Sequence, residues 1–255
     1  MSLEHKRRLP RKTGAVVLAL ALLLLWQGIS AAGFVPGYML PSPARIALAA
    51  IRDFPLLMGH LLRTLEEAAA GLALALVFSF ILAVLMDLSR LLKETVSPLL
   101  TLTQTMPTIA LAPLLILWMG YGTAPKIALV FLTCFFPLTV GLLGAFAAAG
   151  EDELRLLKSM GANRVQLYRY IKVPQSLPAF FSGLRISASY SIIGAVISEW
   201  LGGDAGLGVY MIRVRKSYSF DRMFAAIVLV ALLSLGLLKL VDCLKRALMP
   251  WNKEE

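Results

Sequence analysis

The chain contains a series of apolar runs that are too long for the core of a soluble domain. The first, residues 14–32, has no charged residue over 19 positions, and about 20 apolar residues in a helix span the ~30 Å hydrocarbon core of a bilayer. Only 16% of the residues are charged, whereas 58% are hydrophobic. The sequence therefore predicts an all-α, polytopic membrane protein with about six transmembrane helices, near residues 14–32, 65–86, 99–119, 126–149, 180–201 and 223–240.

The first run follows a basic leader, residues 1–13, and it has some features of a secretory signal. Ser30, Ala31 and Ala32 are the small residues that a cleavage site requires. The length of the run and the five apolar runs that follow it favour an uncleaved transmembrane helix.

Residues 33–63 alternate apolar with charged residues and are too polar for a membrane span. Ser42 is suited to cap a helix that begins at Pro43. The segment is expected to be an external amphipathic helix at the membrane interface, interrupted at Pro55. His60 lies in it without other potential metal ligands, so we interpret it as a polar interfacial residue.

The distribution of Lys and Arg predicts the orientation of the chain. If the N-terminus is cytoplasmic, the cytoplasmic segments hold 16 of these residues and the external segments hold 8, with Arg185 inside the fifth run. This bias predicts a multi-pass protein of the cytoplasmic (inner) membrane with both termini in the cytoplasm. The net charge of +10 therefore indicates topology, and no nucleic-acid partner is expected.

The polar segment 151–178 lies between the fourth and fifth runs and reads as two short amphipathic helices. Gly161-Ala162-Asn163 separates them, because Gly adopts positive φ readily and Asn163 is a good N-cap. Pro174 and Pro178 are expected to end the second helix. A helix-turn-helix of this kind could bind DNA, but the long apolar runs on both sides favour a cytoplasmic docking element.

Two further features shape the expected spans. Pro107 and Pro113 predict a kinked third helix. Residues 202–221 predict an external loop, with four glycines in residues 202–208 that suit a tight, re-entrant turn at a gate.

Gly161, nine further residues and then Ile171-x-Val173-Pro174 resemble the EAA signature of binding-protein-dependent ABC importer permeases. Val173 replaces the Leu of that signature, and Arg155 occupies the position of its Glu. The resemblance covers about residues 40–245, and the chain looks like the permeases for sulfonates, taurine, nitrate and thiamine-precursor pyrimidines. Further stretches that carry it are Pro-Leu-Leu-Ile-Leu-Trp at 113–118, Phe-Phe-Pro at 135–137, Ser-Gly-Leu-Arg-Ile at 182–186 and Glu-Trp-Leu-Gly at 199–202.

The resemblance implies the type I fold of ABC importer permeases and a set of partners: a second permease copy in a homodimer, a cytoplasmic ATP-binding subunit, an extracytoplasmic solute-binding protein and membrane lipid. The chain contains no G-x-x-x-x-G-K-[ST] motif, so ATP and Mg are expected to be used by the partner ATPase, with no cofactor or metal bound directly. The transported solute is expected to be a thiamine-precursor pyrimidine, with sulfonate, taurine or nitrate as alternatives. An integral membrane enzyme or an ion channel is disfavoured because no catalytic set or filter-like repeat is present.

The residue pattern and the resemblance together suggest how the chain is divided and where it functions. The expected parts are a cytoplasmic leader at 1–13, a first helix at 14–32, an external segment at 33–63, a permease core at 64–245 with coupling helices at 151–174, and a cytoplasmic tail at 246–255. The residues expected to couple to the ATPase are Arg155, Lys158, Met160, Gly161, Ala162, Ile171 and Pro174. The residues expected on the substrate pathway or its gate are Glu199, Trp200, Ser191, Tyr190, Arg185 and Met106.

Glu199 and Arg185 are the two charges of the fifth run. Ionisable residues within membrane helices usually face an interior or a cavity, which makes both candidates for the pathway. The alternatives are that Arg185 extends to the cytoplasmic head groups and that Glu199 is solvated at the outer interface. They are 14 residues apart, or about 21 Å along a helix, so they cannot pair within one subunit.

Overall fold

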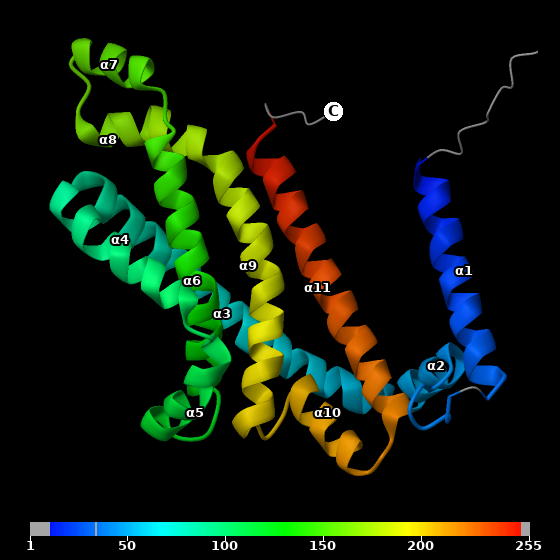
Figure 1. Ribbon diagram of the computed structural model, residues 1–255. Coiled ribbons are helices and arrows are strands. Elements are labelled where there is room, and N and C mark those ends of the chain that lie inside the picture. Colours follow the sequence, from blue (N-terminus) through cyan, green and yellow to red (C-terminus); the bar gives the residue numbers. More distant parts are fainter. Residues whose placement is uncertain (1–10, 34, 251–255) are drawn as a thin grey trace, which may run out of the picture.

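All regular secondary structure is helical in residues 11–33 and 35–250, the part of the chain described in the computed structural model (Figure 1). Most of the basic leader and the last five residues of the expected tail lie outside that part. The elements are α1 (Arg11–Ala31), α2 (Pro43–Arg52), α3 (Phe54–Leu88), α4 (Arg90–Thr105), α5 (Thr108–Met119), α6 (Ala124–Ala147), α7 (Glu151–Ser159), α8 (Arg164–Leu167), the π-helix η1 (Tyr168–Lys172), α9 (Val173–Gly202), α10 (Leu207–Lys216) and α11 (Phe220–Leu248).

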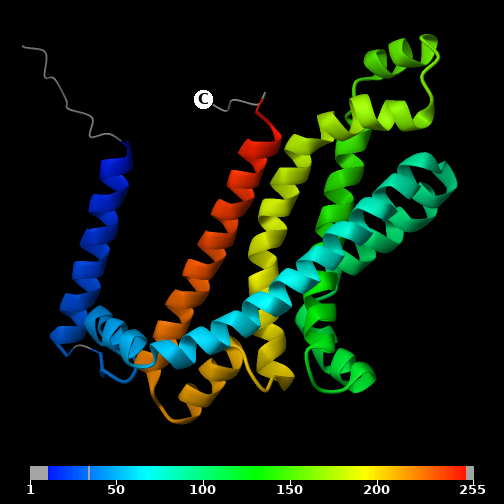
Figure 2. The ribbon, with the colours of Figure 1, turned by 180° about the vertical axis from the view of Figure 1, so that it is seen from behind.

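The centre of the bundle is formed by α3, α6 and α9, and α3 crosses the other two obliquely (Figures 1 and 2). Small residues allow this close packing, as is usual for membrane helices. A β-carbon on Gly71 of α3 would lie only 2.5 Å from the side chain of Val130 on α6. Buried alanines of α3 and α9 line the same core: Ala68, Ala75, Ala188 and Ala195.

The helices agree with the predicted membrane class. Four are long and apolar enough to cross a bilayer, namely α3, the continuous stretch Arg164–Gly202, α6 and α11. The pair α4–α5 adds a fifth if it is taken as one bent span, and α1 contributes a shorter apolar stretch, Val16–Ala31. An all-α, polytopic protein with about six such segments is confirmed.

The third apolar run is not a single kinked helix as predicted. It forms parts of α4 and α5, which meet at an angle of 99°. Met106 and Pro107 between them are both extended, with ψ of 126° and 109°. Proline disfavours the helical conformation in the preceding residue, so Pro107 breaks the helix where a kink was expected.

The prediction that Pro174 and Pro178 end the second coupling helix was wrong. The helix continues without a break from Arg164 to Gly202, over 39 residues. Pro174 is the second residue of α9, and the π-helical turn η1 immediately precedes that helix. In η1 the backbone hydrogen bonds join residues five positions apart and not four. Membrane helices tolerate proline where such local adjustments satisfy the backbone groups that it frees.

The predicted caps are confirmed. The Ser42 side chain accepts a hydrogen bond from the backbone of Arg45 at the start of α2. Asn163 forms a reciprocal capping box with Gln166 at the start of α8. Gly161 has φ of +83°, a conformation that only glycine adopts at little cost.

Two segments predicted as irregular or interfacial are ordered helices. Residues 202–221 contain α10, whose apolar residues Leu207, Tyr210, Met211 and Val214 are buried at helical spacing. Residues 54–63 are the first turns of α3, because the helix breaks at Asp53 and restarts at Phe54 with Pro55 in its first turn. Proline is favoured in the first turn of a helix, which explains why Pro55 lies in the first turn of α3 and does not interrupt the helix.

The orientation can be tested with single cysteines. The described start of α1 and the end of α11 lie at the same end of the bundle as α7 and α8 (Figure 1). In a Cys243→Ser background, we expect Ser159→Cys to be protected from a membrane-impermeant thiol reagent in whole cells and Asp204→Cys to react. Both residues are exposed, so access depends on the side of the membrane. The opposite labelling pattern would contradict the orientation predicted from charge.

Candidate functional site

A cavity of about 600 Å³ lies where the break between α4 and α5 meets α6 and α9. Its walls are mainly apolar, with Leu129 and Leu132 on α6 and Ile193 and Ile197 on α9. Met106, in the break itself, also lines it. Concave, mostly apolar spaces with a few polar groups are typical small-molecule sites.

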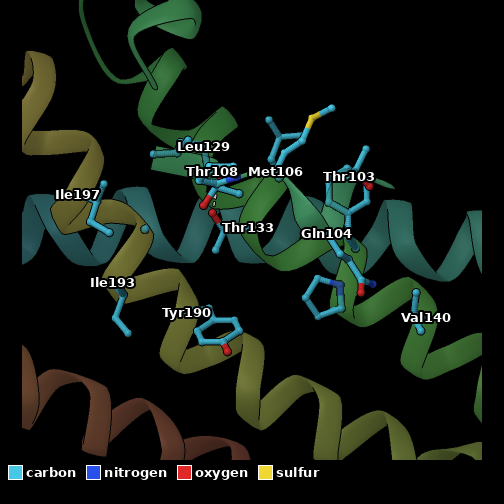
Figure 3. Close-up of a pocket in the computed structure, with 15 residues that line it drawn as sticks. Thr103, Gln104, Met106, Thr108, Leu129, Thr133, Val140, Tyr190, Ile193 and Ile197 are labelled. Atoms are coloured by element: carbon cyan, nitrogen blue, oxygen red, sulfur yellow. Dashed lines mark hydrogen bonds between the residues drawn. The ribbon is translucent and has the colours of Figure 1, made fainter. Parts of the chain in front are cut away.

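The polar groups of the cavity are all uncharged. Gln104 comes from α4, Thr133 from α6 and Tyr190 from α9, so three helices present polar side chains to one space (Figure 3). The Thr133 hydroxyl donates to the backbone oxygen of Leu129 at 2.7 Å. Within the described part of the chain, no hydrogen bond engages the side chain of Gln104 or Tyr190, so both are available to a solute.

A second group of polar residues is buried beside the turn between α9 and α10, and we call it the turn cluster. Glu199 is 1% exposed. One of its carboxylate oxygens accepts a hydrogen bond from the Thr64 hydroxyl at 2.7 Å, and the other accepts one from the backbone N–H of Gly208 at 2.6 Å. The members are His60, Thr64 and Glu67 of α3, Lys126 of α6 and Glu199 of α9.

The remaining members of the turn cluster also hold the turn. Lys126 forms a 2.7 Å ion pair with Glu67, and its ammonium lies 3.4 Å from the backbone oxygen of Ala205. The backbone N–H of Gly206 donates to Nδ1 of His60 at 3.0 Å, and that of Leu207 donates to the Thr64 hydroxyl at 2.9 Å. Residues 205–208 are therefore fixed against α3, α6 and α9.

Of the residues predicted for the substrate pathway, only Met106 and Tyr190 line the cavity. Ser191 is buried and bonds within its own helix, and Trp200 is about half exposed. Arg185 forms a 3.1 Å ion pair with Asp242 of α11. Glu199 is neither solvated at the surface nor on the cavity wall.

Sequence reasoning missed the turn cluster, although a signal was present. His60, Thr64 and Glu67 are spaced i, i+4 and i+7, which places them on one face of a helix. The three residues share a face only because α3 begins at Phe54, so that residues 60–67 all lie within one helix. Gln104 and Thr133 carried no such signal, because uncharged polar residues are common in membrane helices.

The residues predicted to couple to an ATPase fall into three groups. Arg155, Lys158 and Met160 belong to α7 and its end, which projects from the bundle, and Met160 is 75% exposed (Figures 1 and 2). Gly161 and Ala162 form the following turn. Ile171 is buried and Pro174 is half-buried, so these two anchor the segment to the spans.

We expect Glu199→Gln to destabilise the protein by roughly 1.5–3 kcal/mol, because the amide can accept only one of the two hydrogen bonds that the carboxylate accepts. Uptake should fall about tenfold at matched expression. The control is Glu66→Gln, which removes an exposed carboxylate from α3 and should have almost no effect. Thermal unfolding and uptake are the measurements, and equal behaviour of the two variants would contradict this role of Glu199.

Apolar helices long enough to span a membrane and an uncharged cavity between them define a polytopic membrane protein with an internal small-molecule site. Residues 75–253 match the family described as "Binding-protein-dependent transport system inner membrane component". The chain belongs to this family of ABC importer permeases.

Individual relatives and a solved structure extend this comparison. The chain is 36% identical to the formylaminopyrimidine transport permease protein ThiX of Halalkalibacterium halodurans, over 92% of this chain and 94% of that protein. It is 34% identical to the riboflavin transport system permease protein RibX of Chloroflexus aurantiacus, over 94% and 90%. A chain of the MetNI methionine ABC transporter in an inward-facing conformation has a similar fold, with a TM-score of 0.69, 19% identity and coverage of 77% of this chain and 97% of that one.

Proposed function

We propose that this permease imports a thiamine-precursor pyrimidine. The observation that carries the proposal is the cavity, which presents Gln104 and Tyr190 and no charged side chain among the described residues. An amide and a phenol can both donate and accept hydrogen bonds, as the edge of a pyrimidine requires. Two relatives bear names for transport of nitrogen heterocycles, formylaminopyrimidine and riboflavin.

The uncharged cavity disfavours the anionic alternatives. Sulfonate and nitrate carry a full negative charge, and moving an ion out of water costs several kcal/mol unless a counter-charge receives it. Among the described residues, those that line the cavity include no Lys, Arg or His. A neutral heterocycle loses only hydrogen bonds to water, which Gln104 and Tyr190 can replace.

The same proposal assigns partners to the exposed surfaces. A cytoplasmic ATP-binding subunit would dock on α7 and the turn at Gly161, and an extracytoplasmic solute-binding protein would deliver the solute at the opposite end. A second copy of the chain would cover the apolar side chains that α4 and α5 leave exposed beside the cavity. Leu102, Leu117 and Trp118 are 58%, 77% and 72% exposed.

Uptake assays test the substrate. We expect cells that express the transporter with its partners to take up labelled formylaminopyrimidine and not taurine. Tyr190→Phe and Gln104→Leu should each reduce uptake by about tenfold, since each loses a hydrogen bond of roughly 1–1.5 kcal/mol in a desolvated site. Tyr38→Phe removes an exposed hydroxyl far from the cavity in sequence and is the control. Uptake of taurine but not of the pyrimidine would overturn the proposal.

A further inference from the structure

The end of α3 opposite the turn cluster carries a second, partly buried polar junction. The Asp87 carboxylate accepts hydrogen bonds from the Tyr168 hydroxyl and from the Lys172 ammonium. The Lys172 and Asp87 side chains are only 17% and 13% exposed. A largely buried carboxylate that holds two partners through one oxygen links these elements far more firmly than an exposed ion pair does.

Both partners of Asp87 belong to the π-helix η1. Tyr168 is its first residue and Lys172 its last, so the two side chains lie on the same face of the helix and reach the same carboxylate. The Lys172 ammonium also lies 5.1 Å from the centre of the Tyr168 ring, and that ring contacts Phe146 of α6 edge to face. Single π-turns within α-helices are uncommon and occur frequently at functional sites.

This junction lies directly between α7 and the spans. The segment that follows α7 turns at Gly161, forms α8 and becomes η1, which then continues as α9. Along the chain from the end of α7, a displacement reaches η1 before it reaches α9. The start of α7 follows α6 and also contacts α9, because the backbone N–H of Gly150 donates to the Gln175 side chain at 3.0 Å. At η1, Asp87 connects the segment to α3.

The uninterrupted helix α3 joins the two polar junctions. Thr64 and Asp87 are 23 residues apart on one uninterrupted helix, or about 35 Å. At one end Asp87 holds η1, and at the other Thr64 holds Glu199 and the backbone of Leu207. Helix α3 is thus hydrogen-bonded both to η1, just before α9, and to the residues at the end of α9 and the start of α10.

We infer that Asp87 is a positioning residue that transmits movement of α7 to α3, and through α3 to the turn between α9 and α10. This inference rests on the proposed role of α7 as the dock of the ATPase. Asp87 touches neither the solute nor the ATPase, and it acts by making η1 and α3 move together. Without it, movement of η1 reaches α3 only through the packing of α3 against α6 and α9.

Asp87→Asn in the reconstituted complex tests the inference. We expect the ATPase to co-purify as in the wild type and to hydrolyse ATP, while solute transported per ATP falls at least tenfold. The charge exchange Asp87→Lys with Lys172→Asp should restore most of this ratio. Tyr168→Phe keeps the ring and the ion pair, so it should fold normally and lower the ratio severalfold. Asp242→Asn, which breaks the ion pair of α11 with Arg185, is the control and should leave the ratio unchanged.

The results distinguish a residue that links η1 to α3 from a residue that shapes the docking surface. Wild-type transport per ATP in both Asp87→Asn and Tyr168→Phe would overturn the inference. Loss of ATPase binding in parallel with transport would also overturn it, because Asp87 would then shape the docking surface. Failure of the wild-type complex to bind an ATPase at α7 would instead contradict the proposed function. If the transported solute is not the proposed pyrimidine, only the solute used in the transport assay changes.

Discussion

Lys126→Met is expected to destabilise the protein by about 3–5 kcal/mol, because it leaves Glu67 as a buried carboxylate without its counter-charge. The two side chains are 6% and 3% exposed, so water cannot replace the lost ammonium. The variant should also release the backbone oxygen of Ala205, loosening the turn between α9 and α10. Thermal unfolding of the purified protein in detergent and its yield from membranes are the measurements.

Two further variants make this result specific to the turn cluster. Lys93→Met removes an exposed lysine of α4 and should unfold like the wild type. The double variant Lys126→Met with Glu67→Gln should recover part of the stability, since a neutral amide is less costly to bury than an unpaired carboxylate. A Lys126→Met variant as stable as Lys93→Met would show that the buried ion pair does not hold the turn.

Gly161→Val is expected to abolish coupling to the ATPase while membrane insertion is retained. The position has φ of +83°, where a left-handed conformation costs most residues about 1–2 kcal/mol and a β-branched residue more. Nothing lies within 4 Å of a β-carbon built there, so the effect arises from the backbone and not from a clash. Transport-coupled ATPase activity of the reconstituted complex should fall at least tenfold, because the altered turn points α7 in a different direction.

Asparagine provides the matched control at the same position, because it tolerates positive φ better than other non-glycine residues. Gly161→Asn should therefore keep most of the coupled activity. If Gly161→Val assembles normally and retains full activity, the turn after α7 has no part in the mechanism. If both variants lose activity equally, the space around Gly161 in the complex matters, and not its backbone conformation.

The working parts of the transporter would lie in separate regions of one subunit. The solute would meet the cavity between α4, α5, α6 and α9, the ATPase would meet α7, and α3 would connect the two ends of the bundle. Glu199, which the sequence suggested for the pathway, belongs to the turn cluster in the structure. Glu199→Gln would reduce uptake whether Glu199 lay on the pathway or held the turn. Only a role in holding the turn also leads us to expect lower thermal stability.

The sequence by itself determined the membrane class, the family resemblance and the local caps. Each of these depends on neighbouring residues: a run of uncharged residues fits a bilayer by its length, Ser42 and Asn163 cap helices through residues three positions away, and Gly161 takes positive φ because it has no side chain. Such features require no knowledge of what packs against them.

The tertiary structure alone decided which polar residues meet. Glu199 accepts a hydrogen bond from Thr64, 135 positions earlier, and Asp87 holds Lys172, 85 positions later. It also decided that Pro107 separates two helices at 99° whereas Pro174 lies within a continuous one. A proline removes a donor in both places, but whether the helix breaks depends on bonding and packing around it, and these come from distant segments.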